Sequence, residues 1–281
     1  MRLLTAPFRV VLPFALSLLV VACSSEPESG GPASSPDAAI SSSVQALRNN
    51  DISAFLAATM PPEMIQKMQA EFEDARSEPI DPNEAQQFAD MMQRLTAPGA
   101  EEKLSAEIKP QLQQNAAQLP FLIGMGRGMA QSSLQQSQDR NDEQKTQAGQ
   151  LLVSVADWAE SAALTNPDKL DQAIAVICNA ARAMELDSLE AAQALSFDDA
   201  LGKAGGVLGA TKELFNIYGL SMDEFLDSVS TKTVNSDDGS ATVEVAYSLF
   251  GQSYDTEVQM AKAGDHWFSQ GIVDEMNSPG E

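Results

Sequence analysis

The residues that could carry nucleophilic or metal chemistry are few in this chain of 281 residues. It has one histidine, His266, and two cysteines, Cys23 and Cys178. One histidine cannot supply paired imidazole ligands, and two cysteines cannot form a four-thiolate zinc site. The sequence also lacks the spaced Asp-x-Asp-x-Asp-Gly pattern of a calcium loop. We therefore expect no metal site and no cofactor.

A nucleophilic site would have to use His266 or Cys178. His266 follows Asp265 at a predicted hairpin turn, where exposure to solvent explains both residues more simply than catalysis does. Cys178 shares an apolar helical stripe with Ile174 and Ile177, which predicts a buried, unreactive thiol. We predict no catalytic residue from these two side chains.

A glycine-rich stretch, FLIGMGRGMAQ, could suggest a phosphate-binding loop. It does not match the G-x-G-x-x-G fingerprint, because position 129 is methionine and no predicted strand precedes it. Arg127 is the one side chain here that could meet an anion. We expect close helix packing or a hinge, with Met125 and Met129 in a core. The glycines concerned are Gly124, Gly126 and Gly128.

Paired carboxylates are the one catalytic device that the 40 acidic residues could supply, as in glycoside hydrolysis. Each adjacent pair lies at a predicted helix cap or turn, so a solvated surface explains it. We therefore predict that the protein is not an enzyme. The pairs are Glu73-Asp74, Glu101-Glu102, Asp198-Asp199, Asp237-Asp238 and Asp274-Glu275.

The charge balance excludes one class of partner and favours another. The chain has 17 basic and 40 acidic residues and a net charge of −23. Nucleic-acid-binding proteins show a basic footprint, so this sequence indicates no nucleic-acid partner. An acidic field of this size speeds encounter with a cationic protein. The 43% hydrophobic content is enough for a folded core.

The first 22 residues are organised as an export signal. Arg2 and Arg9 precede an apolar run over residues 10–22. The run is too short to span a membrane comfortably as a mature helix. The run ends in Leu-Val-Val-Ala, and Cys23 and Ser24 follow.

This segment resembles the lipobox of bacterial lipoprotein precursors. In that family the signal is removed before the cysteine, whose thiol receives a diacylglyceryl group and whose new amine is acylated. The resemblance implies lipidation at Cys23 and a membrane anchor. Ser24 after the cysteine implies an outer-membrane lipoprotein that faces the periplasm. An ordinary cleaved signal, with Cys23 a chance thiol, is the alternative.

The rest of the chain divides into a tether and two predicted domains. Residues 23–36 are rich in Ser, Gly, Pro and Glu and read as a flexible tether. Periodicity predicts a helical domain over 37–165, with a kink or break at Pro110. An α+β domain follows over 166–281. Helix starts are predicted at Ser35, Asp81, Asn166, Asp187, Ser196 and Ser221.

The pattern changes to strand alternation after Val229, with turn signals between the runs. We expect a three- to four-stranded antiparallel sheet with one buried and one acidic face, whose last run spans 266–273. The fold class is therefore α+β. Methionines in the helical part are expected as core filler, or as the lining of a groove for an apolar ligand or a partner helix. They are Met64, Met68, Met91 and Met92.

Helices followed by a sheet that ends in Lys-Ala-Gly-Asp-His-Trp-Phe resemble the C-terminal half of NTF2-like α+β lipoprotein domains. The resemblance covers about residues 166–275 and implies a cone-shaped fold.

Our hypothesis is a lipid-anchored, non-catalytic bacterial envelope protein that binds a basic protein in the periplasm through an acidic surface. A sharper form is an immunity-type inhibitor of a basic toxin. The alternative is a carrier or sensor of an apolar small molecule in a helical or NTF2-like cavity. The sequence does not predict an oligomeric state.

Overall fold

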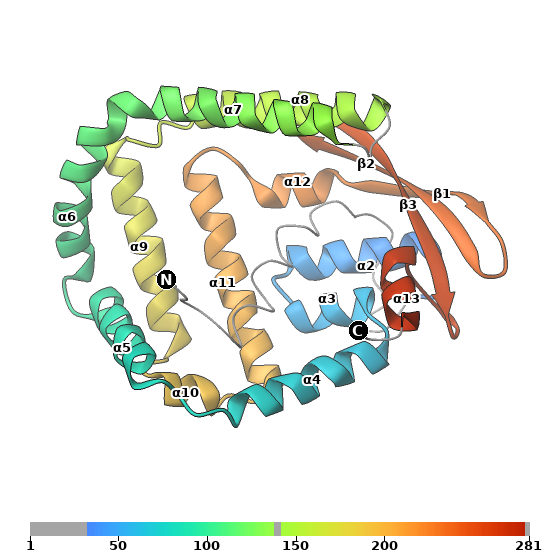
Figure 1. Cartoon of the computed structure of the whole chain (residues 1–281), viewed down its shortest axis with the longest axis horizontal. Helices are drawn as coiled ribbons and strands as arrows, with labels where there is room; N and C mark the ends of the chain where they lie inside the picture. The colour runs from blue at the N-terminus through green and yellow to red at the C-terminus, as the bar shows by residue number, and fades with distance from the viewer. Residues whose placement is uncertain (1–32, 138–141, 279–281) are drawn as a thin grey trace.

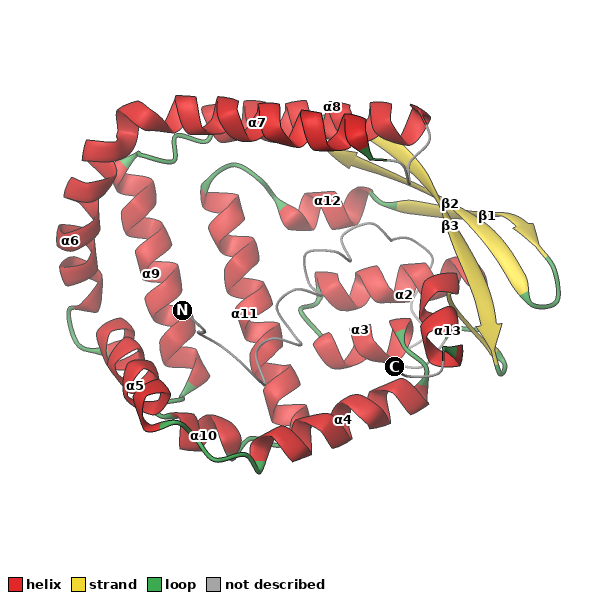
Figure 2. Cartoon of the chain, in the orientation of Figure 1, coloured by secondary structure: helices red, strands yellow, loops and turns green. Residues whose placement is uncertain are grey.

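The computed structural model describes residues 33–137 and 142–278, with the side chains of 142–144 left out. The predicted signal, Cys23 and most of the predicted tether lie outside the described residues. Within them, helices precede a four-stranded antiparallel sheet (Figure 2), so the predicted α+β class is confirmed.

The elements follow one another with short connections. The first half holds α2 (Pro36–Arg48), α3 (Ile52–Thr59), α4 (Pro62–Arg76), α5 (Pro82–Thr96), α6 (Ala100–Asn115), the 3-10 turn η1 (Ala116–Gln118), α7 (Leu119–Gln136) and α8 (Asp142–Ser161). The second half holds α9 (Pro167–Met184), α10 (Leu189–Gln193), α11 (Phe197–Ile217), α12 (Met222–Ser228), β1 (Ser230–Ser236), β2 (Ser240–Leu249), β3 (Gln252–Ala263), β4 (His266–Ser269) and α13 (Gln270–Asn277).

The helices run around the edge of the molecule and then cross its interior (Figure 1). Helices α4, α5 and α6 follow the periphery, and α7 and α8 lie side by side along the edge opposite α4. Helices α9 and α11 cross between these edges, and α2 and α3 lie beside the sheet. The strand order is β1-β2-β3-β4, so each strand pairs with its neighbour in sequence.

Local capping signals set most helix starts. Ser35, Asp81 and Asn166 are N-caps whose side chains accept backbone N–H groups, and each is followed by proline at the first helical position. The predicted caps Ser196 and Ser221 are also confirmed.

Two predicted boundaries are wrong, and helix α6 shows no break at Pro110. It continues through the proline to Asn115, and the neighbouring Lys109 pairs with Asp171 of α9 at 2.6 Å. The cap of α10 is Ser188 rather than Asp187, because the serine oxygen is the acceptor that reaches Ala191 N. The last strand ends at Ser269, and residues 270–277 form α13.

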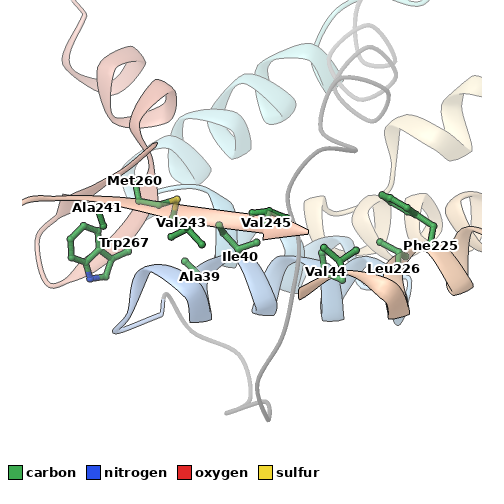
Figure 3. Packing of buried hydrophobic residues seen from close by; sticks show 11 residues of the cluster. Ala39, Ile40, Val44, Phe225, Leu226, Ala241, Val243, Val245, Met260 and Trp267 are labelled. Carbon is green, nitrogen blue, oxygen red and sulfur yellow. The ribbon is translucent and has the colours of Figure 1, made fainter. Parts of the chain in front are cut away.

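The main hydrophobic core lies between α2 and the sheet (Figure 3). Ile40 and Val44 of α2 pack beneath Val243 and Val245 of β2, and Trp267 of β4 closes one end. The core therefore joins residues on both sides of the predicted boundary at 165/166. Helix α2 packs with the C-terminal sheet, although it is separated from that sheet by more than half of the chain.

A tight corner between α2 and α3 is packed against α11. Asn50 has a left-handed backbone (φ 57°), and Asp51 then caps α3 by accepting from Ala54 N at 2.9 Å. A Cβ atom at Gly205 of α11 would collide with the carbonyl oxygen of Asn50. Glycine at 205 is therefore what lets α11 reach this corner.

We predict that Gly205→Ala destabilises the protein by about 1–3 kcal/mol, because the added methyl meets backbone rather than a movable side chain. Gly206→Ala is the matched control, since a Cβ there meets nothing within 4 Å. It should stabilise α11 by about 0.5–1 kcal/mol. Urea unfolding measures both, and a gain in both variants would contradict the close approach.

Candidate interaction surface

The sheet has one buried and one polar face, as the alternation predicts. Ala241, Val243 and Val245 point into the core with α2 and α12. The intervening residues of β2 and their partners on β3 form the opposite side, which we call the outer face. Its members on these two strands are Thr242, Glu244, Ala246, Asp255, Glu257 and Gln259.

Strand register brings like charges together on the outer face. Glu244 of β2 lies directly opposite Glu257 of β3, and both residues are exposed. Asp255, also exposed, is two residues from Glu257 and therefore on the same face. Lys232 of β1 is opposite Glu244 on its other side. Directly opposed like charges destabilise a sheet, so this arrangement favours contact with a cation.

Helix α13 covers one end of the outer face. Val273 packs with Ala261 and Phe268 there, which leaves the end with Glu244 and Glu257 uncovered. The exposed side of α13 adds the carboxylates of Asp274 and Glu275. The outer face of β2 and β3 is therefore a partly covered acidic surface.

The five acidic pairs predicted at caps and turns contact neighbouring side chains. In each pair at least one member has a nearby partner. These contacts are Glu73–Arg76, Glu101–Arg182, Asp199–Ser196, Asp237–Ser240 and Asp274–Gln270.

The pair between Glu101 and Arg182 joins α6 to α9. Its two N–O contacts measure 2.6 Å and 3.0 Å, in a bidentate arrangement. The hydrogen bonds from Arg182 lower the pKa of Glu101 to about 2. This contact between two helices accounts for Glu101, where the sequence predicts only a solvated surface.

His266 and Cys178 do not form a nucleophilic pair. Cys178 is fully buried in α9, beside Ile174 and Ala100, and burial raises the pKa of its thiol. The predicted buried thiol is confirmed. His266 begins β4, half-buried, and its Nδ1 is buried without a hydrogen-bond partner among the described residues. The exposure expected for His266 is therefore only partial.

Two hollows of the described chain lie beside α7. One hollow of about 570 Å³ opens beside Met129 and is otherwise lined by serine and glutamine. Another, of about 510 Å³, lies between α7, α8 and Gln252, mostly among polar side chains. Across residues 33–137 and 142–278, no group of three or more His, Cys, Asp or Glu is placed to hold a metal ion.

The expectation for the glycine-rich stretch is wrong. Residues 124–128 lie inside the continuous helix α7, and a Cβ at any of its three glycines would meet nothing within 4 Å. Met125 and Met129 are exposed instead of lying in a core. Arg127 points to α8, where its Nη1 lies 3.5 Å from Asp157.

The methionines predicted as core filler differ in their burial. Met92 is buried against Ala181 and Leu186, and Met64 and Met68 pack at the edge of the cluster around α3. Met91 is exposed. The helical spacing alone did not distinguish the buried methionine from its neighbour.

Comparison with known proteins gives no relative from which a function could be transferred. No family model matches the chain, and neither the curated proteins nor the solved structures provide a match. Among the described residues, no helix is both long and apolar enough to cross a membrane.

The ion pair of Glu101 predicts an acid-dependent loss of stability. Its folded pKa of about 2 lies below the ordinary 4.5, so the stabilisation is complete above pH 4.5 and is lost as the pH falls toward 2. Glu101→Gln should be less stable than the wild type at neutral pH and lose less stability between pH 4.5 and 2.

Urea unfolding across this pH range measures the difference. Glu102→Gln removes a carboxylate from the same helical turn without touching Arg182, and should keep the acid-dependent loss of the wild type. Identical pH profiles for Glu101→Gln and the wild type would contradict the role of the pair.

Proposed function

We propose that this protein is a lipid-anchored, non-catalytic lipoprotein of the bacterial outer membrane that binds a basic protein in the periplasm. The observation that carries the binding surface is the direct opposition of Glu244 and Glu257 on the uncovered part of the outer face. Asp255 adds a third exposed carboxylate to the same patch. We call these three residues the acidic patch.

The energetics of the acidic patch support a cationic partner. In the free protein, each glutamate repels the one opposite it, and only Lys232 lies on the same row to offset the charge. A lysine or arginine of a partner placed between the two glutamates relieves that repulsion on binding. The net charge of the whole chain adds a long-range attraction that accelerates encounter.

The proposed anchor rests on the sequence before the described residues. The apolar run over 10–22 and the Cys23 that follows it support removal of the first 22 residues and lipidation of the cysteine. Removal takes away Arg2 and Arg9 and no acid, so the mature net charge becomes −25, which is 15 basic minus 40 acidic residues. A sharper form of this proposal is an immunity-type inhibitor of a basic toxin, which the proposed location and the acidic charge support.

Lipidation predicts a change in both mass and partitioning for Cys23→Ser. The wild-type chain should carry acyl groups on Cys23 and fractionate with outer membranes, since several acyl chains give stable anchoring. The variant should lose the added mass and leave the outer-membrane fraction. Mass spectrometry of the purified N-terminus decides the matter, and a wild-type Cys23 with no acyl group would end the proposed anchoring.

Neutralising the acidic patch should have two effects: weaker binding of basic proteins and a more stable sheet. We expect Glu244→Gln/Glu257→Gln to resist urea better than the wild type, because the opposed charges are gone. The same variant should associate roughly tenfold more slowly with basic proteins captured from an envelope extract at low salt. High salt should abolish most of the difference.

Glu71→Gln/Asp74→Asn on α4 is the matched control, because it removes two exposed carboxylates away from the sheet. It should keep most of the association rate. Equal losses in the two double variants would show that net charge alone, and not the acidic patch, attracts the partner. Capture of no basic protein even at low salt would contradict the proposed binding function.

A further inference from the structure

Helix α7 turns large apolar side chains toward solvent. Phe121 and Met129 are 70% and 68% exposed, and Leu122 and Met125 are each 48% exposed. Phe121, Met125 and Met129 follow a spacing of four residues, so they lie along one side of the helix with Leu122 beside them. We call these four residues the α7 apolar face.

The opposite side of α7 fixes the helix in place. It packs against α8, which in turn is attached to the end of α11 and to the turn between β2 and β3: Trp158 Nε1 of α8 donates to the carbonyl of Tyr218 at 2.9 Å, and its ring lies beside Phe250. The α7 apolar face therefore belongs to a helix whose other side is already occupied. The three glycines of α7 have open space around them, so no side chain rises beside the apolar residues at these positions.

The charge around α7 differs from that of the rest of the chain. Residues 108–138 form the longest stretch of the sequence without an acidic residue, and they contain Lys109 and Arg127. The whole chain carries 40 acidic residues and a net charge of −23. A surface with anionic groups would be repelled by most of this protein but not by α7.

We propose that the α7 apolar face inserts into the lipid surface of the membrane. A helix with one apolar side lies in the plane of the interface with that side buried at the boundary between headgroups and acyl chains. Ser132, Ser133 and Gln136, next to Met129 on the open side of α7, can hydrogen-bond to headgroups there. The absence of acids over 108–138 lowers the repulsion that anionic lipids would otherwise exert, and the neighbouring Asp157 of α8 is paired with Arg127.

The size of the face favours a bilayer over a second copy or a protein partner. A stable protein interface uses about 20–30 residues on each side, whereas this face offers four large apolar residues on one helix. A weak lipid contact is sufficient if a tether already holds the protein at the membrane. This argument rests on the proposed anchor at Cys23: nine residues lie between it and Ala33, whose carbonyl accepts from Trp267 N at 3.3 Å, and the ten residue steps reach at most about 35 Å.

The test uses the complete chain as the bacterium processes it, reconstituted into vesicles of equal parts phosphatidylethanolamine and phosphatidylglycerol. An environment-sensitive fluorophore is placed at Met125→Cys, and lipids with a quencher in the acyl chain report insertion. Met91→Cys on α5 is the matched control, because Met91 has the same 48% exposure. Cys178 is fully buried, and the parent chain labelled in the same way gives the background.

We expect lipid quenching at position 125 and not at position 91, unchanged by high salt. Adding Phe121→Ser/Met129→Ser should lower the inserted fraction, with a partition constant reduced roughly tenfold or more. Equal quenching at both positions would overturn the proposal. So would shielding of position 125 without lipid, together with a doubled particle mass by light scattering, because a second copy would then cover the face.

The mass of the same preparation separates this inference from the proposed anchor. A chain without acyl groups whose position 125 is still quenched by lipid would end the anchor at Cys23 and keep the α7 contact. An acylated chain whose position 125 is quenched no more than position 91 would keep the anchor at Cys23 and end the α7 contact.

Discussion

The ammonium group of Lys212 is the interaction on which the arrangement of the two halves depends. Its Nζ donates to the carbonyls of Leu47 and Arg48 at 2.7 Å and 3.0 Å and lies 2.9 Å from Asp223. Those carbonyls are at the C-terminal end of α2, where the helix dipole favours a cation. Asp223 also pairs with Arg48 at 3.0 Å. One buried lysine of α11 thus connects α2 and α12, the two helices that form the main core with the sheet.

The connection explains why the chain can return to its start after more than a hundred residues. Helix α2 contributes Ile40 and Val44 to the core under the sheet, while α3, after the corner at Asn50, belongs to a second cluster with Leu201 of α11. Glycine at 205 lets α11 approach that corner. Two turns later on the same helix, Lys212 donates hydrogen bonds to the carbonyls at the end of α2. Changing the spacing between Gly205 and Lys212 would separate the two hydrophobic clusters. The glycine must reach the corner at Asn50 while the lysine reaches the end of α2.

Local features were predictable, and the features set by register and tertiary contact were not. The caps at Ser35, Asp81 and Asn166 act within three residues of themselves, so the sequence contains their whole cause. The opposition of Glu244 and Glu257 depends on which residue of β3 faces which residue of β2, and a shift of β3 by one residue would turn Glu257 to the other face.

Helical periodicity has a similar limit. It places Met125 and Met129 on one side of α7 but does not say that both side chains are exposed among the described residues. Even so, the two proposed surfaces have a fixed relation to each other. Ser154 of α8 lies 3.4 Å from Tyr254 on the buried face of the sheet, so the α7–α8 pair adjoins the side opposite the acidic patch. If α7 rests on lipid, the acidic patch is on the face of the sheet turned away from that pair. An anionic membrane would then repel the patch least, and a cationic partner could reach it from the periplasm.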